Sequence, residues 1–261
     1  MTTEITDAQI EAVARQLVES AETRIPVEAL GIEPGDVATG YRIQEAGHGM
    51  HDAQLIGWKA GCTTAVAQKF LDVDGPVAGR YRSDHVLAAP AQIAAAEFAT
   101  PPHLEVEVGL RLLVDIDSAP LDAMQLADAV EAFAAIEVVA SRLAAFPMVS
   151  GPLLVADNVA GARMVVGPTL DLDAAGVRSL DTTPVTLTID GDEVAAGSGA
   201  DALGHPLKVL AWLAGHAAER GTPLRSGELV ITGTCTGLVA ARPGARHVGR
   251  VGDTDVSLAV R

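Results

Sequence analysis

The stretch Pro102-His103-Leu104-Glu105-Val106-Glu107-Val108-Gly109-Leu110 decides the fold that this sequence predicts. Apolar and polar residues alternate along it, which is the pattern of a β-strand whose successive side chains point to opposite faces. Glu105 and Glu107 are two residues apart and therefore share one face, while the apolar residues between and around them face the other way. The stretch predicts a strand that carries two carboxylates toward one point.

A third carboxylate, Glu137, interrupts the apolar run from Phe133 to Ala140. An unpaired carboxylate buried in such a run costs several kcal/mol or has to take up a proton, and a shared cation removes that cost. Glu105, Glu107 and Glu137 therefore predict an all-carboxylate site, which suits Mg²⁺ or Mn²⁺ rather than zinc. For the first pair, glutamates on the wet face of an antiparallel strand are the open alternative.

The bulk composition indicates a globular chain with a large core. It has 261 residues, 49% of them hydrophobic, and a mean hydropathy of +0.28. A formal charge of −16 disfavours nucleic acid and anionic membranes as partners. Cys62 and Cys235 match no metal or redox spacing, and the acidic amino terminus lacks an export signal, so we expect a cytoplasmic protein.

Helical and strand patterns alternate irregularly along the chain. They predict helices over 6–22, 37–53, 64–71 and 206–220, strands over 55–61, 228–232 and 255–260, and a hairpin around Asp190-Gly191-Asp192. The glycine-rich segment 72–82 reads as a mobile lid or a plain connector. The fold class is α+β, with curved antiparallel or mixed sheets, a small helical N-terminal region over 1–53 and a β-rich catalytic domain over 54–261.

Six short blocks resemble, in order, the 2-oxopent-4-enoate hydratase and 4-oxalocrotonate decarboxylase family of the fumarylacetoacetate hydrolase superfamily. The similarity covers nearly the whole chain. The blocks are Gly57-Trp58-Lys59-Ala60-Gly61, His103-Leu104-Glu105-Val106-Glu107, Ile136-Glu137-Val138-Val139-Ala140-Ser141-Arg142, Ala156-Asp157-Asn158, Leu203-Gly204-His205-Pro206 and the run from Leu224 to Thr234. The resemblance implies rolled mixed β-sheets around the active site and a homo-oligomer. It also implies Mg²⁺ or Mn²⁺ held by Glu105, Glu107 and Glu137.

The general acid/base of the family maps onto Lys59. Burial disfavours an ammonium and favours proton transfer, although neighbouring carboxylates act in the opposite direction. Taken without the resemblance, Lys59 predicts a surface lysine that keeps its charged end in water.

Other positions depart from the family pattern. Pro76-Val77-Ala78-Gly79 lacks the acidic residue usual in the lid, and the following Arg80-Tyr81-Arg82 either offers cations to a second substrate carboxylate or is solvated. His103 stands where an arginine is usual, and it either orients a ligand or is an ordinary strand residue.

Two threonines and an acid complete the candidate residues. Thr234 and Thr236 lie in a block similar to decarboxylases and dicarboxylate hydratases, so we expect them to contact substrate with Arg80 and His103. Asp157 either supports the site or caps a helix.

The combined prediction is a metal-dependent lyase that acts on 2-oxoenoate or 2-hydroxydienoate acids through a metal-bound dienolate. It would add water to the activated double bond or release CO₂ from a vinylogous 2-oxo diacid. The alternatives are a C–C bond hydrolase of acylpyruvates and an altered member that binds a partner enzyme of its pathway.

Overall fold

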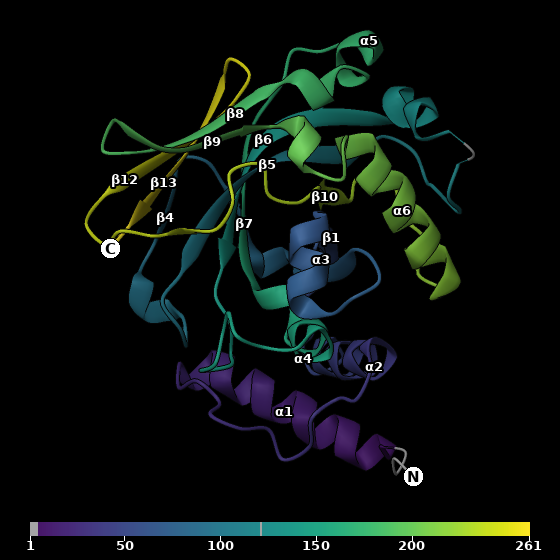
Figure 1. Ribbon diagram of the computed structural model, residues 1–261, viewed down its shortest axis with the longest axis vertical. Helices are drawn as coiled ribbons and strands as arrows, with labels where there is room; N and C mark the ends of the chain where they lie inside the picture. The colour runs from purple at the N-terminus through teal and green to yellow at the C-terminus, as the bar shows by residue number, and fades with distance from the viewer. Residues whose placement is uncertain (1–4, 121) are drawn as a thin grey trace.

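Two β-sheets and a set of peripheral helices build the computed structural model, which describes residues 5–120 and 122–261 (Figure 1). The larger, eight-stranded sheet runs in the order β2 (Val77–Arg82), β1 (Leu55–Gly61), β10 (Leu229–Ile231), β5 (His103–Leu112), β6 (Val130–Val139), β7 (Gly161–Thr169) and β3 (Val86–Ala88), with β11 (Val239–Ala240) beside β5. The smaller sheet runs in the order β4 (Ala91–Ile93), β13 (Thr254–Val260), β12 (Arg246–Val251), β8 (Pro184–Ile189) and β9 (Asp192–Ser198).

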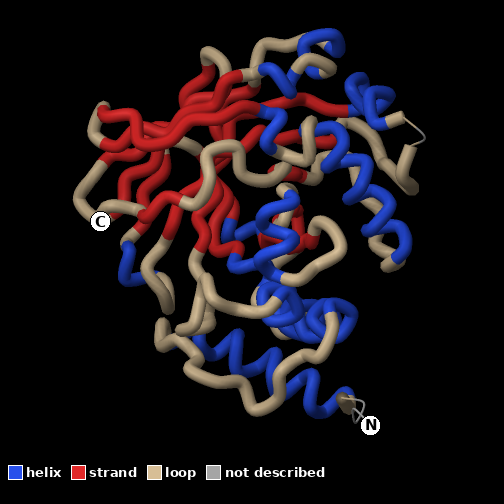
Figure 2. Tube along the Cα trace, viewed as in Figure 1, coloured by secondary structure: helices blue, strands red, loops and turns tan. Residues whose placement is uncertain are grey.

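Both sheets mix parallel and antiparallel pairs. β1 pairs with β10 and β3 with β7 in parallel, whereas β5 and β6 form a long antiparallel ladder. The strands curl around one another in the upper part of Figure 1, and Figure 2 shows the strands gathered on one side of the molecule. The predicted α+β class with rolled mixed sheets is confirmed.

The apolar faces of β5 and β6 pack against the smaller sheet. Val106 and Ile136 are fully buried and belong to the main hydrophobic cluster. Gly249 of β12 lies so close to them that an added Cβ would stand 2.8 Å from Val106. Glycine is therefore required where the two sheets make this approach, and the glutamates of β5 and β6 point to the opposite face.

Helices cover the lower and right-hand sides of the molecule in Figure 1. They are α1 (Asp7–Thr23), α2 (Val37–His48), α3 (Ala65–Leu71), α4 (Gly151–Ala156), α5 (Ala174–Val177) and α6 (Pro206–Glu219), with 3₁₀ turns at Ser83–His85, Ala95–Glu97, Ala123–Ala129, Asn158–Ala160, Leu180–Thr182 and Gly199–Asp201. Thr6 and Gln9 form a capping box that starts α1. Among the described residues, no helix combines the length and the apolarity that crossing a membrane requires.

The N-terminal helices have a small core of their own. Ile10, Val13 and Leu17 of α1 pack against Ile43 of α2 and Leu143. These residues recur at helical spacing, so the periodicity that predicted the helices also identifies the face that they bury.

The prediction of a lid or connector over residues 72–82 is wrong for its second half. Val77–Arg82 is strand β2, which pairs antiparallel with β1 and places Gly79 opposite Lys59. A Cβ at Gly79 would stand 2.8 Å from the Asn158 carbonyl oxygen and 3.0 Å from Lys59 Cγ. Gly79 thus marks a close approach of β2 to two other segments of the chain, not a flexible segment.

Candidate metal centre and active site

Three glutamates meet on one face of the β5–β6 ladder. Glu105 lies directly opposite Glu137 in the register, and Glu107 follows two residues along the same face. One carboxylate oxygen of each lies within 4.8 Å of the others. Glu107 is only 1% exposed and Glu137 is fully buried, which excludes the alternative of solvated surface glutamates for these two.

The hydrogen bonds of these carboxylates leave one oxygen free on each of two glutamates. Glu107 Oε2 accepts from the Gly233 backbone N–H at 2.6 Å, and Glu137 Oε1 accepts from the Tyr81 hydroxyl at 2.5 Å. Glu107 Oε1 and Glu137 Oε2 are buried and have no hydrogen-bond partner among the described residues. Two oriented, unpaired oxygens beside a third carboxylate are a site for a cation with oxygen ligands.

The electrostatics of the cluster also call for positive charge. Burial raises the pKa of Glu105 to about 7, helped by the charge of Glu137 and opposed by Lys59. Burial and the two neighbouring carboxylates raise the pKa of Glu107 well above its usual range. The ionised triad is therefore unfavourable by itself, and a divalent cation such as Mg²⁺ or Mn²⁺ fits the residues present.

Lys59 lies inside the larger sheet, next to this cluster. Its side chain is 3% exposed, and its Nζ lies 2.6 Å from Glu137 Oε1 and donates to the Val159 carbonyl at 2.9 Å. Burial disfavours the ammonium, but the charges of Glu137, Glu105 and Glu107 outweigh it and raise the pKa of Lys59. The alternative of a surface lysine is wrong.

A strained turn supplies the carbonyl that holds Lys59. Asn158, Val159 and Ala160 have φ angles of 51°, 53° and 55°, three successive left-handed residues of which none is glycine. Such conformations cost about 1–3 kcal/mol each and cluster at functional sites. The Asn158 side chain fastens the turn to β2, because it accepts from the Arg80 N–H at 2.8 Å and donates to the Arg80 carbonyl at 3.0 Å.

Asp157 fixes the start of the same turn. Its carboxylate accepts from the Ser141 hydroxyl at 2.6 Å and from the Arg142 guanidinium, and it makes no side-chain cap bond to the turn that follows it. Asp157 is almost fully buried. Of the two roles considered for it, the side-chain helix cap is not observed, because the carboxylate is bonded to Ser141 and Arg142 instead.

The remaining predicted residues divide into two groups. His103 and Thr234 are placed near the glutamates: His103 shares their face of β5, and Thr234 directly follows Gly233, whose N–H bonds Glu107. His103 Nδ1 and Thr234 Oγ1 are buried without a hydrogen-bond partner among the described residues. The Thr236 hydroxyl instead accepts from the Val106 backbone N–H at 3.1 Å, so it bonds the main chain of β5.

The structure does not bring Arg80 to the glutamates. Its guanidinium lies 4.2 Å from the centre of the Trp58 ring and 3.6 Å from Glu228, because side chains alternate along β2 and Arg80 faces away from Gly79 and Tyr81. The same alternation brings Tyr81 to the site, fully buried, so the solvated reading is wrong for that residue. Sequence reasoning missed this role because it did not recognise β2 as a strand.

A rolled mixed sheet with a buried carboxylate triad and an adjacent lysine defines a class of metal-dependent enzymes. The chain belongs to one family within it: the family model described as fumarylacetoacetate (FAA) hydrolase C-terminal matches residues 63–258.

Two relatives are similar in sequence. A 2-keto-4-pentenoate hydratase of Paraburkholderia phymatum is 32% identical over 253 residues, with 94% of each chain covered. A 4-oxalocrotonate decarboxylase of a Pseudomonas species is 31% identical over 199 residues, which cover 74% of this chain and 73% of the relative.

The whole fold is shared with solved structures. The 4-oxalocrotonate decarboxylase from Pseudomonas putida G7, complexed with magnesium and adipate, superposes with a TM-score of 0.90 over 100% of both chains at 23% identity. At that identity the match establishes the shared fold.

Proposed function

We propose that this protein is a divalent-metal-dependent lyase that acts on small 2-oxoenoate or 2-hydroxydienoate acids, adding water to them or releasing CO₂ from them. The observation that carries the proposal is the pair of unpaired oxygens, Glu107 Oε1 and Glu137 Oε2, beside the buried Lys59. The sequence similarity to a 2-keto-4-pentenoate hydratase and a 4-oxalocrotonate decarboxylase supports the substrate class.

In this proposal Glu105, Glu107 and Glu137 hold Mg²⁺ or Mn²⁺. When bound, the cation supplies positive charge that orients a 2-oxo acid and stabilises negative charge developing on it. The Gly233 N–H and the Tyr81 hydroxyl hold Glu107 and Glu137 in the orientation that leaves an oxygen of each available.

Lys59 is the proposed proton carrier. The carboxylate charges that raise the pKa of Lys59 are the ones a cation would neutralise, so we expect that pKa to fall in the loaded enzyme. The Val159 carbonyl keeps Nζ in place when the proton leaves, since a carbonyl accepts from either an ammonium or an amine. Lys59 is thereby held at one position while it donates or accepts a proton at a substrate carbon.

The test is to load the protein with Mg²⁺ or Mn²⁺, add a 2-hydroxydienoate or 4-oxalocrotonate, follow dienol absorbance and identify the product by mass. Gain of water or loss of CO₂ supports the proposal, whereas cleavage into two fragments identifies a hydrolase. Lys59→Met should abolish turnover, and the exposed control Lys69→Met should not. Full activity in Lys59→Met, or unchanged Mn²⁺ binding in Glu107→Gln, would refute the assigned roles.

Two further expectations accompany the proposal. The family resemblance predicts a homo-oligomer that associates with a partner enzyme of the same pathway, and light scattering of the purified protein tests the homo-oligomer. The cytoplasmic location predicted from the amino terminus is tested by cell fractionation.

A further inference from the structure

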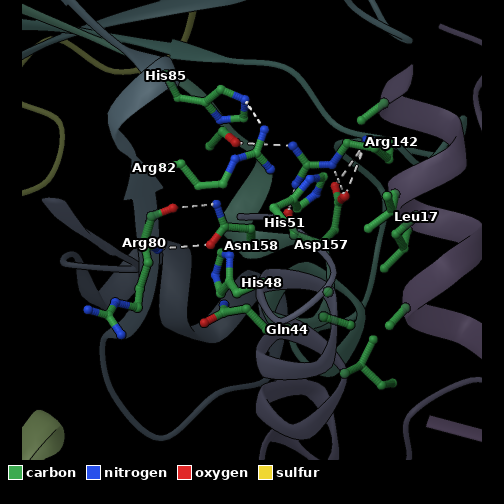
Figure 3. Close-up of a pocket in the computed structure, with 17 residues that line it drawn as sticks. Leu17, Gln44, His48, His51, Arg80, Arg82, His85, Arg142, Asp157 and Asn158 are labelled. Carbon is green, nitrogen blue, oxygen red and sulfur yellow. Dashed lines mark hydrogen bonds and ion pairs between the residues drawn. The ribbon is translucent and has the colours of Figure 1, made fainter. Parts of the chain in front are cut away.

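A second group of polar residues surrounds a cavity behind the strained turn, between the N-terminal helices and β2. The cavity has a volume of about 90 Å³ and is lined by the residues drawn in Figure 3. Three arginines and three histidines are among them, with Asp157 as the one carboxylate. In a protein with a net charge of −16, three arginines at one cavity favour an anion locally.

The cavity lies on the opposite side of the turn from Lys59. Asn158 and Gly161 line it, and a Cβ at Gly161 would stand 3.0 Å from Lys59 Cδ. Arg80 and Arg82 lie on the cavity side of β2, opposite to Gly79 and Tyr81, and the guanidinium of Arg80 is directed away from the cavity onto Trp58. None of the three glutamates lines this cavity.

One buried nitrogen atom at the cavity lacks the partner that buried polar groups normally have. His48 Nε2 is inaccessible to solvent and makes no hydrogen bond to any described residue. Near the glutamates the unpaired atoms are carboxylate oxygens, which require a cation, whereas the unpaired atom here is a nitrogen at a cavity that Arg82 and Arg142 also line. An oxyanion would satisfy it, directly where Nε2 carries the ring proton or through a bridging water.

The two arginines Arg82 and Arg142 differ in how many of their hydrogen-bond donors are used. Arg82 forms an ion pair with Asp84 at 3.1 Å and bonds His85 Nε2 at 2.8 Å, and Figure 3 shows its guanidinium between His85 and Arg142. Arg142 donates to the Asp157 carboxylate and to three backbone carbonyls, so it contributes charge rather than free donors. Among the described residues, the hydrogen bonds of Arg82 use Nε and one terminal nitrogen, which leaves the other terminal nitrogen as a donor.

The pKa values of the histidines at the cavity are lowered by burial and by nearby arginines. Burial and the charges of Arg80, Arg82 and Arg142 lower the pKa of His48 to about 3. Burial and the charges of Arg82 and Arg163 lower the pKa of His85 to about 3, and the pKa of His51 shifts in the same direction. Burial is the main cause that keeps these rings neutral, and the arginine charges, which act in the same direction, would attract an anion in the cavity.

We propose that the cavity lined by His48, His51, Arg80, Arg82, His85 and Arg142 is a binding site for a small oxyanion, separate from the glutamate centre. The ligand is either inorganic phosphate or the carboxylate of a small organic acid, since both present oxygens that match arginine donors. The volume of about 90 Å³ limits the bound group to an ion of this size, with any longer body directed outward.

The test uses the full-length protein, freed of metal with EDTA so that no anion can bind through a cation at the glutamates. Isothermal titration at low ionic strength with inorganic phosphate, and separately with acetate, should give saturable binding of one ion per chain for at least one of them. Binding of phosphate alone, of acetate alone, or of both identifies the source of the oxyanion. No saturable binding of either ion overturns the proposal.

Variants locate the site. Arg82→Gln should weaken binding by about tenfold or more, and Arg82→Lys by less, because a charged donor is lost in the first and kept in the second. His48→Leu provides an independent second variant, and Arg250→Gln, in an exposed ion pair with Asp255, is the matched control. Circular dichroism and melting curves confirm that each variant is folded.

The opposite pattern would assign the anion elsewhere. Binding that survives in Arg82→Gln and in His48→Leu but disappears in Lys59→Met would place it at the glutamate centre and refute the proposal. Equal weakening by Arg250→Gln would reduce the effect to net charge. Since turnover is not measured, the result is independent of the proposed lyase activity.

Discussion

The hydroxyl of Tyr81 and the ammonium of Lys59 both reach the same oxygen of Glu137, Oε1, at 2.5 and 2.6 Å. Two donors on one oxygen restrict rotation of the carboxylate and leave Oε2 without a partner among the described residues. Tyr81 therefore acts through Glu137, as a positioning residue for the candidate metal centre.

Removal of this hydroxyl should weaken cation binding. Tyr81→Phe keeps the ring but frees Glu137 to rotate, so we expect Mn²⁺ affinity to fall by about 10- to 100-fold, the range for lost outer partners of metal ligands. Electron paramagnetic resonance of free Mn²⁺ measures it without turnover. Tyr41→Phe is the matched control, because its hydroxyl accepts from the Ala78 N–H at 2.8 Å, away from the carboxylates. An equal loss in both variants would contradict the role given to Tyr81.

A single added methyl group at Gly161 should disturb the same arrangement. Its Cβ would stand 2.9 Å from the Tyr81 hydroxyl oxygen and 3.0 Å from Lys59 Cδ. Gly161→Ala should therefore lower the free energy of unfolding by about 1–3 kcal/mol, as overpacking usually does, and weaken Mn²⁺ binding as well.

Urea unfolding and Mn²⁺ titration check both effects of Gly161→Ala. Gly35→Ala is the control, since nothing lies within 4 Å of its Cβ position. If Gly161→Ala behaves like Gly35→Ala, the site tolerates more movement than these distances allow.

The ion pair between Arg142 and Asp157 should be important for stability. Asp157 is almost fully buried, and Asp157→Ala would leave the Arg142 guanidinium, 13% exposed, without its carboxylate. Breaking a buried pair at one partner typically costs about 3–5 kcal/mol, and we expect a loss of that size in chemical denaturation. Asp255→Ala removes the acid of an exposed pair with Arg250 and should cost much less. Similar losses in the two variants would show that the buried pair is not special.

The partly buried His216 should make stability depend on pH. Burial, helped by the charge of Arg220, lowers the pKa of His216 to about 4, so between about 6.5 and 4 the unfolded chain binds a proton that the folded chain does not. The contribution of His216 is thus fully present above pH 6.5 and is lost as the pH falls toward 4. It amounts to at most about 1.4 kcal/mol per pH unit.

The glutamates with a raised pKa act with the opposite sign, so the comparison has to be between variants. The difference in the free energy of unfolding between wild type and His216→Phe cancels the carboxylate contribution, which is common to both. We expect this difference to shrink from pH 7 to pH 4.5 in urea titrations. A difference that stays constant over this range would exclude the assigned titration.

The glutamate triad could be predicted from sequence because its signal is a property of side chains. Glu105 and Glu107 follow the period of a strand, and Glu137 interrupts an apolar run where a lone carboxylate is costly. Lys59 required the family resemblance, since a single lysine in an apolar segment is also compatible with a solvated end.

The supporting contacts could not be predicted in the same way. The Val159 carbonyl and the Gly233 N–H are backbone groups that every residue but proline carries, and only the folded path of the chain selects these two. Tyr81 was hidden by Gly79, because glycine signals both flexible loops and close-packed strands. Chain contact, visible only in three dimensions, separates the two cases.

The oxygen that holds Lys59 in the turn Asn158–Ala160 belongs to the main chain. Any residue that tolerates the left-handed conformation at position 159 would present the same carbonyl, so the anchor of the lysine is insensitive to the identity of the side chain there. During divergence, the side chain at position 159 can therefore change within the space that its burial allows, while Lys59 keeps the same backbone acceptor.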